Sequence, residues 1–281
     1  MTRPVRPLPP YEAAHPWIGH LMRLGFAARG ILYALIGLLT LASIFNHRHR
    51  MQVGMSDAFI SISSVTIYYL RPGIVLLLGL AVGFAGFALG MMWTAFFDWN
   101  DEGRSLVGIL KRLGTFIGGA GHIGLMATAV LMMIGHQPND DSTRRWTAWA
   151  LDYPGGRILV AIAGTWAGGY GLFLLSKFVT GRLDNKLDYT AMSKSTTRWT
   201  NITGRFGMLS RGAIYLTIGC VLVVAGWMGT ARNVVGFGGA MLTIAQDTFG
   251  WIALSAIAIG LFAYGIFMMI EARYRRIGRR T

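Results

Sequence analysis

Residues 23–37 read RLGFAARGILYALIG, and residues 205–219 repeat the pattern as RFGMLSRGAIYLTIG. Both stretches share Arg-x-Gly followed by Arg-Gly-x-x-Tyr-x-x-x-Gly at identical spacing. Residues 112–122, RLGTFIGGAGH, begin in the same way but carry Gly118 in place of the second arginine and His122 in place of the tyrosine. An internal repeat at this level determines the architecture before any single residue is considered.

The repeat extends into a second helix of each copy. Each second helix begins at a glycine and carries an aromatic residue fourteen positions later: Gly73 and Phe87, Gly156 and Tyr170, Gly250 and Tyr264. Each copy is therefore predicted to be a helix, an outer connection and a returning helix. We divide the chain into an N-terminal segment, 1–22, and three repeats, 23–111, 112–204 and 205–281, the last with a basic tail.

The composition is that of a membrane protein, since 53% of the 281 residues are hydrophobic, 14% are charged and the mean hydropathy is +0.48. A helix needs about 20 apolar residues to cross a bilayer. Six such spans are predicted at 24–45, 73–97, 114–135, 157–180, 207–228 and 250–271. The predicted fold is an all-α polytopic membrane protein. Its three helical hairpins share one orientation around a pseudo-threefold axis along the membrane normal.

The basic residues predict the orientation. The connections that follow the first, third and fifth spans hold seven of the 26 lysines and arginines. The remainder lie at the termini, in the other connections and at the helix ends beside them. The positive-inside rule then places both termini in the cytoplasm. Basic residues that flank spans attract anionic lipids, so the net charge of +14 indicates the cytoplasmic membrane face as a partner and not nucleic acid.

The outer connections of the second and third copies contain short amphipathic segments. Residues 146–151 and 241–246 have mixed polar and apolar faces, which is typical of helices that lie at a membrane interface. In the first copy, residues 59–70 favour a strand as readily as a helix, so the conformation of 54–71 is left open.

The motifs at 23–37 and 205–219, which begin the first and third copies, resemble those of the DUF1206 family of bacterial membrane proteins. So does the returning helix that contains Gly260-Leu-Phe-Ala-Tyr264-Gly265 and ends in Glu271-Ala-Arg273. The resemblance covers nearly the whole chain after residue 20 and is most specific in the first and third copies. It implies six spans in three pairs in the bacterial inner membrane, and it supplies no mechanism.

Two arginines are the strongest candidates for a site. Arg29, Tyr33 and Gly37 fall at i, i+4 and i+8 on one helical stripe, as do their counterparts in the third copy. A guanidinium inside a span costs a few kcal/mol unless it finds a partner. One interpretation is structural: each arginine clamps a carbonyl, a lipid phosphate or Glu271. A second is that both arginines face inward and bind an anion. A third is that they extend to the interface without a specific partner.

The candidate residues follow from the first two of these interpretations. The candidate ligand-binding residues are Arg29, Tyr33, His122, Arg211 and Tyr215. The candidate structural residues are Gly30, Gly37, Gly118, Gly212, Gly219 and Glu271.

The second copy leaves two alternatives open. The small residues around Gly118 let the third span pack tightly where its counterparts carry arginine, or they leave an opening in the ring. His122 is expected to be a hydrogen-bonded core residue whose partners are the equivalent Tyr33 and Tyr215.

The function predicted first is non-enzymatic: binding or passive passage of a small anion or a lipid headgroup at the pseudo-threefold centre. The alternative is a structural or accessory subunit beside a larger membrane complex, with another membrane protein as partner. A redox protein centred on His122 ranks last, since a haem would need partner histidines on other helices. No cofactor, metal site or catalytic motif is predicted.

Overall fold

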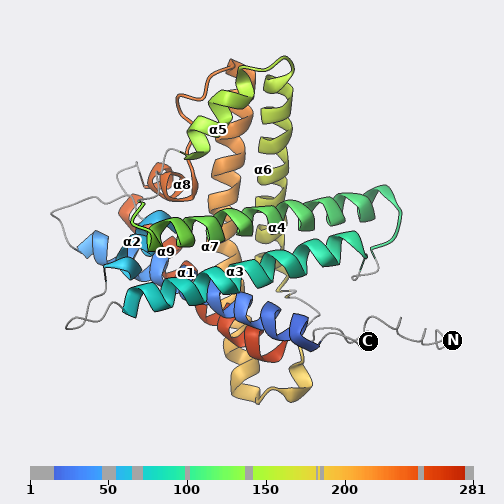
Figure 1. Cartoon of the computed structure of the whole chain (residues 1–281), viewed down its shortest axis with the longest axis vertical. Helices are drawn as coiled ribbons and strands as arrows, with labels where there is room; N and C mark the ends of the chain where they lie inside the picture. The colour runs from blue at the N-terminus through green and yellow to red at the C-terminus, as the bar shows by residue number, and fades with distance from the viewer. Residues whose placement is uncertain are drawn as a thin grey trace.

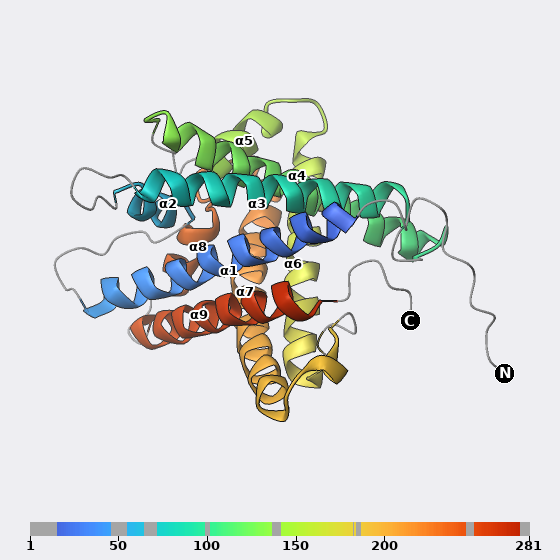
Figure 2. The ribbon, with the colours of Figure 1, turned by 60° about the horizontal axis from the view of Figure 1, so that its bottom comes forward.

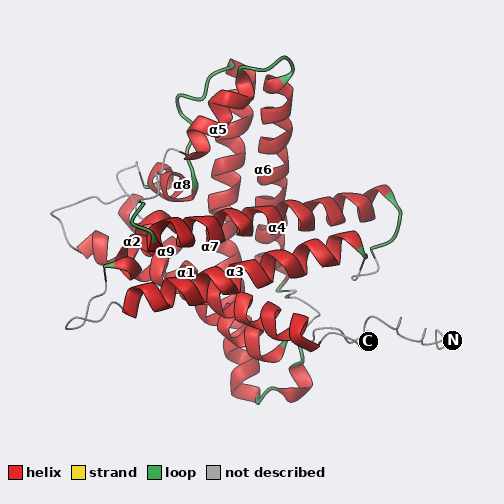
Figure 3. Ribbon diagram, in the orientation of Figure 1, coloured by secondary structure: helices red, strands yellow, loops and turns green. Residues whose placement is uncertain are grey.

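The computed structural model describes residues 16–45, 55–64, 72–98, 102–136, 142–181, 183, 187–245 and 250–275. Within these ranges the chain is helical, apart from connecting turns (Figure 3). One isolated antiparallel bridge joins Leu187 and Arg275. Six helices are long and apolar enough to cross a membrane: α1 (Pro16–Phe45), α3 (Pro72–Phe96), α4 (Leu106–Met133), α6 (Gly156–Thr180), α7 (Lys194–Met228) and α9 (Gly250–Tyr274). The predicted all-α fold with six spans is confirmed.

Shorter helices occupy the connections. These are α2 (Met55–Ser63), α5 (Ser142–Leu151), α8 (Phe237–Ile244) and the 3₁₀ turn η1 (Tyr189–Ala191). Of the two segments expected to be interfacial, 146–151 lies in α5 and 241–244 lies in α8, whereas residue 246 lies outside the described residues. The open question in the first copy is answered in part, because α2 is a helix, whereas residues 65–71 lie outside the described residues. Residues 1–15 and most of the basic tail, 276–281, also lie outside them.

Two long helices begin earlier than their apolar stretches, because serines cap them. The side chain of Ser105 accepts a hydrogen bond of 3.1 Å from the amide of Gly108 at the start of α4. Ser193 accepts one of 3.1 Å from Thr196 at the start of α7. Such caps satisfy amides that have no partner within the helix. As a result α7 has 35 residues, more than a bilayer requires.

The six long helices pack in a cyclic order. Each returning helix packs most extensively on the opening helix of the next copy: α3 on α4, α6 on α7, and α9 back on α1. Figure 2 shows α9 lying alongside α1, so the last copy meets the first. Within the first and third copies, α1 also packs on α3 and α7 on α9. This order is the one expected for three repeats around a pseudo-threefold axis.

The same close backbone approach recurs at all three junctions between copies. It occurs at the residue after Arg29, Gly118 or Arg211, which is Gly30, Gly119 or Gly212, respectively. A Cβ there would lie within van der Waals overlap of a carbonyl oxygen on the neighbouring helix: 2.9 Å from that of Gly265, 3.2 Å from that of Ala88 and 3.1 Å from that of Gly171, respectively. Small residues permit this approach, as at other membrane helix interfaces.

The second copy differs from the other two. Its helices α4 and α6 pack on α3 and α7, but they make no comparably close contact with each other. In Figure 1, α6 and α7 stand vertically, whereas α3 and α4 run across the picture. Figure 2 shows the same crosswise arrangement. The cycle of helices is therefore open between α4 and α6.

One residue accounts for this opening. In the other copies the position ten residues into the returning helix is Gly83 or Gly260, and each glycine lies against the backbone of its own opening helix. In α6 this position is Trp166, whose Cζ2 would be 2.9 Å from a Cβ at Gly114 of α4. An indole between two helices excludes the backbone approach that glycine allows. Trp166 therefore acts as a wedge that holds α4 and α6 apart.

Candidate functional site

The side chain of Arg211, on α7, lies where α7 meets α1, α6 and α9. It is 5% exposed. Four tyrosines surround its guanidinium, and we call them the tyrosine cage: Tyr33 on α1, Tyr170 on α6, Tyr215 on α7 and Tyr264 on α9. The distances from Cζ to the four ring centroids are 5.5, 6.0, 5.5 and 4.6 Å, respectively. Aromatic rings at such distances attract a cation through their electron-rich faces.

Hydrogen bonds to the cage satisfy only part of this guanidinium. Nη1 of Arg211 donates to the hydroxyl of Tyr264 at 2.5 Å, and Nη2 donates to that of Tyr170 at 3.4 Å. Its Nε is buried without a hydrogen-bond partner, and no carboxylate of the described residues pairs with it. Each phenolic oxygen that accepts from the arginine still has its own O–H to donate. The cage is therefore rich in donors and carries an uncompensated positive charge.

Three aromatic pairs repeat around the cycle at equivalent positions. Each joins a returning helix to the next opening helix: Phe87 with His122 at 4.7 Å between ring centroids, Tyr170 with Tyr215 at 5.1 Å, and Tyr264 with Tyr33 at 5.0 Å. The pseudo-threefold relation thus extends from the backbone to the side chains of the site. The predicted candidates Tyr33, Arg211 and Tyr215 are brought together.

His122 takes the place of a tyrosine in this arrangement, but its predicted partners were wrong. Its Nδ1 lies 2.6 Å from the carbonyl oxygen of Gly118, one turn earlier in α4. Its ring lies against Phe87 and, at 6.2 Å, Phe84. The reason is that α4 packs on α3, so the histidine meets aromatic residues of α3 and not tyrosines of the other copies.

Arg29 has the same position in α1 as Arg211 in α7, but it is less enclosed. Its Cζ lies 4.8 Å from the ring centroid of Phe87, just as that of Arg211 lies 4.6 Å from Tyr264. Phe87 has no hydroxyl, and no hydrogen bond to Arg29 is formed within the described part of the chain. Arg29 is only half-buried. The two arginines are equivalent in position but not in environment.

The proposed clamp through Glu271 is not formed. Glu271 is buried and pairs with Arg275, one turn later in α9. The guanidinium of Arg275 also lies 4.6 Å from the ring of Phe26. The one described buried acid therefore already has a cation, and it does not neutralise Arg29 or Arg211.

Of the two alternatives for the small residues around Gly118, the structure shows tight packing; the gap in the cycle lies elsewhere, on the α6 side of α4. Toward α3 the packing is tight, since a Cβ at Gly118 would lie 2.7 Å from Cε of Met91. Toward α6 the cycle is open. The remaining glycine candidates, Gly37 and Gly219, lie against the backbone of α9 and α6, respectively.

Two roles are clear from the structure and were not predicted. Arg112 donates to the carbonyl oxygens of Ala95 at 2.8 Å and Phe96 at 2.9 Å, and Arg205 donates to that of Phe178 at 3.2 Å. The first arginine of the second and third repeats thus donates hydrogen bonds to carbonyl oxygens at the end of the preceding helix. Such carbonyls have no partner within the helix, and basic residues are favoured beside them. Tyr170 and Tyr264 belong to the site. Their repeated spacing was noted, but not their contact with an arginine of another helix.

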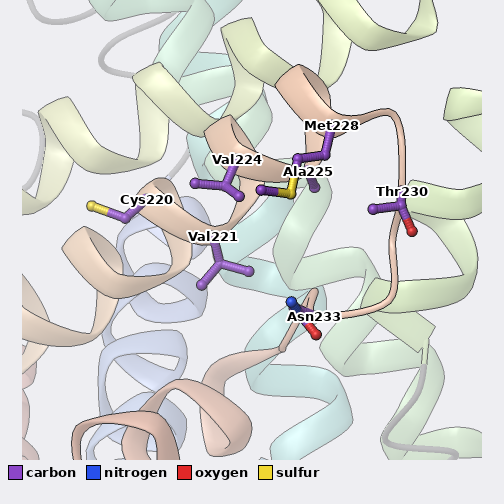
Figure 4. Close-up of a pocket in the computed structure, with 7 residues that line it drawn as sticks. All are labelled: Cys220, Val221, Val224, Ala225, Met228, Thr230 and Asn233. Carbon is purple, nitrogen blue, oxygen red and sulfur yellow. The ribbon is translucent and has the colours of Figure 1, made fainter.

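One pocket, shown in Figure 4, is lined by none of the residues of the tyrosine cage. It has a volume of about 220 Å³ and is lined by residues that include Cys220, Val224, Met228 and Asn233. Cys220 lies nine residues beyond Arg211, about 13 Å along α7. No charged residue lines this pocket, so it is not part of the candidate site.

Comparisons with known proteins agree with the repeat. The family described as Domain of Unknown Function (DUF1206) matches residues 24–98, 113–181 and 206–275. A protein of Bacillus subtilis (strain 168) described as uncharacterized, YxxB, is 27% identical over 270 residues, which cover 95% of this chain and 94% of that protein. No solved structure matches the chain. Since the three matched segments cover most of the chain and coincide with its three pairs of long helices, the chain belongs to the DUF1206 family.

Proposed function

We propose that the tyrosine cage binds a small anion, or the anionic headgroup of a lipid, at Arg211. The observation that carries this proposal is the buried guanidinium, whose Nε has no partner and which has no carboxylate among the described residues. A charged side chain inside a span costs about 2.5 to 3.5 kcal/mol by insertion scales. A bound anion would offset that cost and accept hydrogen bonds from Nε and from the tyrosine hydroxyls.

The membrane location that we propose for the chain fits this role. We place the chain in the bacterial inner membrane with both termini in the cytoplasm, because the basic residues concentrate on that side. Arg211 is the middle residue of α7, but it lies near the basic end of the apolar stretch 207–228, so an anion would enter from the cytoplasm or from the inner leaflet. The protein would act without catalysis, by binding the anion or letting it pass.

The accessory-subunit role is the second candidate. Large apolar side chains are exposed along α4 and α6, including Ile109, Ile158 and Leu159. Contact with a membrane protein partner would cover them, and the arginines would then be internal struts.

Anion-dependent thermal stability of the purified protein in mild detergent tests the first proposal. Inorganic phosphate or sulfate is exchanged for chloride at constant ionic strength, so that general salt effects cancel. A ligand at 100 times its Kd stabilises the folded state by about 2.7 kcal/mol. We expect a saturating rise of the melting temperature for the natural protein and none for Arg211→Gln.

Arg205→Gln is the matched control, because the side chain of Arg205 contacts Phe178 at the end of α6 and no residue of the tyrosine cage. Its baseline stability falls, but its anion-dependent rise remains. Arg29→Gln is expected to reduce the rise without abolishing it. An unchanged rise in Arg211→Gln would rule out the site.

A further inference from the structure

The helix faces that are buried within the first and third copies are uncovered in the second. We call this surface the α4–α6 face and define it by Leu113 and Ile117 on α4 and by Trp166, Tyr170 and Phe173 on α6. Tyr170 is 37% exposed, whereas the equivalent Phe87 and Tyr264 are each 4% exposed. Ile117 is 50% exposed, whereas the equivalent Ala28 and Ser210 are each 3% exposed.

One end of the α4–α6 face carries a positive charge that the other copies lack. Lys177 stands where the first copy has Thr94 and the third has Glu271. Its Nζ lies 4.7 Å from the ring centroid of Phe173, so the ammonium is held over the edge of this face. No acid of the described residues pairs with it.

The length of this face along α6 matches the thickness of one membrane leaflet. Lys177 lies eleven residues beyond Trp166, which is about 16 Å along α6. Half of the hydrocarbon core of a bilayer is about 15 Å thick. With Lys177 at the headgroup level of the leaflet, Trp166 reaches the middle of the membrane.

We propose that the α4–α6 face binds one anionic phospholipid of the cytoplasmic leaflet. Its phosphate pairs with Lys177, and an acyl chain lies along Phe173 and Ile117 as far as Trp166. Two features favour a lipid over a protein helix: the cation at the end of an apolar surface, and the indole that keeps the surface from closing. This site is distinct from the anion site at Arg211, to which Tyr170 connects it through its hydroxyl.

Native mass spectrometry of the detergent-purified protein tests this inference, with added phosphatidylglycerol compared with zwitterionic phosphatidylethanolamine. We expect one tightly held phosphatidylglycerol and a clear preference for it. Lys177→Thr, which introduces the first copy's residue, should weaken its binding about five-fold, as expected for one basic residue near the membrane surface. Trp166→Gly introduces the residue of the other copies, lets α4 and α6 approach and should abolish the adduct.

Two controls separate this site from general effects of charge and folding. Lys194→Thr removes a charge at the exposed start of α7 and should leave the adduct unchanged. Trp166→Phe keeps an aromatic wedge and should retain the lipid adduct.

Equal binding of the two lipids would overturn the inference, and so would an unchanged affinity for phosphatidylglycerol in Lys177→Thr. The inference would also be overturned if the purified protein were a dimer without bound lipid and Trp166→Gly made it monomeric, because a second copy of the chain would then occupy the face. Arg211→Gln should keep the lipid, so this result is independent of the anion site.

Discussion

At the scale of single residues, the site depends on which arginine has hydroxyl partners. Arg29 and Arg211 arise from the same sequence pattern, yet Arg29 lies over Phe87 and Arg211 over Tyr264. The pattern alone could not distinguish them, because the decisive residue belongs to another helix. The sequence did predict that Tyr33, Arg211 and Tyr215 share a site, since they fall at helical spacing on opening helices.

Tyr264→Phe tests the hydrogen bond between Tyr264 and Arg211. The phenyl ring fits, because Phe87 has the equivalent position, so the change removes only the hydroxyl that accepts from Nη1. We expect a loss of about 1 to 2 kcal/mol in the free energy of unfolding, in the range for a buried bond to a charged group within a membrane protein. Denaturant unfolding in detergent measures it. Tyr153→Phe on the exposed part of the outer connection is the control, and a loss of equal size there would contradict the assignment.

At the scale of helices, close backbone contact joins successive copies. The repeated glycines indicated tight interfaces, and they lie where α1 meets α9, α4 meets α3 and α7 meets α6. Which helices would meet could not be predicted, because a repeat specifies equivalent surfaces but not their partners. An opening in the ring was one of the alternatives, but it was expected at the small residues around Gly118 and not between α4 and α6. Its cause, Trp166, lies outside the opening pattern on which the prediction was based.

Gly171→Ala tests the contact between α6 and α7. A Cβ at Gly171 would lie 2.6 Å from the amide nitrogen of Leu216, whereas nothing lies within 4 Å of one at Gly169. We expect Gly171→Ala to lower the free energy of unfolding by about 1 to 3 kcal/mol through overpacking. Gly169→Ala should leave it unchanged or raise it by up to about 1 kcal/mol, because alanine favours a helix. Thermal unfolding in detergent compares the two, and equal effects would show that α7 does not approach α6 so closely.

At the scale of the whole molecule, each copy packs on the next, and the last packs on the first. The ring of helices is nevertheless open, because α4 and α6 of the second copy do not pack closely on each other. The α6–α7 pair lies crosswise to α3 and α4 (Figure 1). Spans that share a bilayer tilt by no more than about 40° from its normal. The gap between α4 and α6, where Trp166 lies, is therefore the place where the helices depart most from a common direction.

The orientation of the molecule in the membrane can be tested with single cysteines. Replacing Cys220 by serine removes the natural thiol, and Ser142→Cys or Ser195→Cys then places one on an exposed helix start. Ser142 begins α5 in an outer connection, and Ser195 lies in the first turn of α7 on the basic side. In intact cells whose outer membrane is permeable, a maleimide that cannot cross the inner membrane should label Ser142→Cys and leave Ser195→Cys unlabelled. Disruption of the inner membrane should make both reactive. The opposite labelling pattern would reverse the orientation and move Lys177, with the lipid it is proposed to bind, to the outer leaflet.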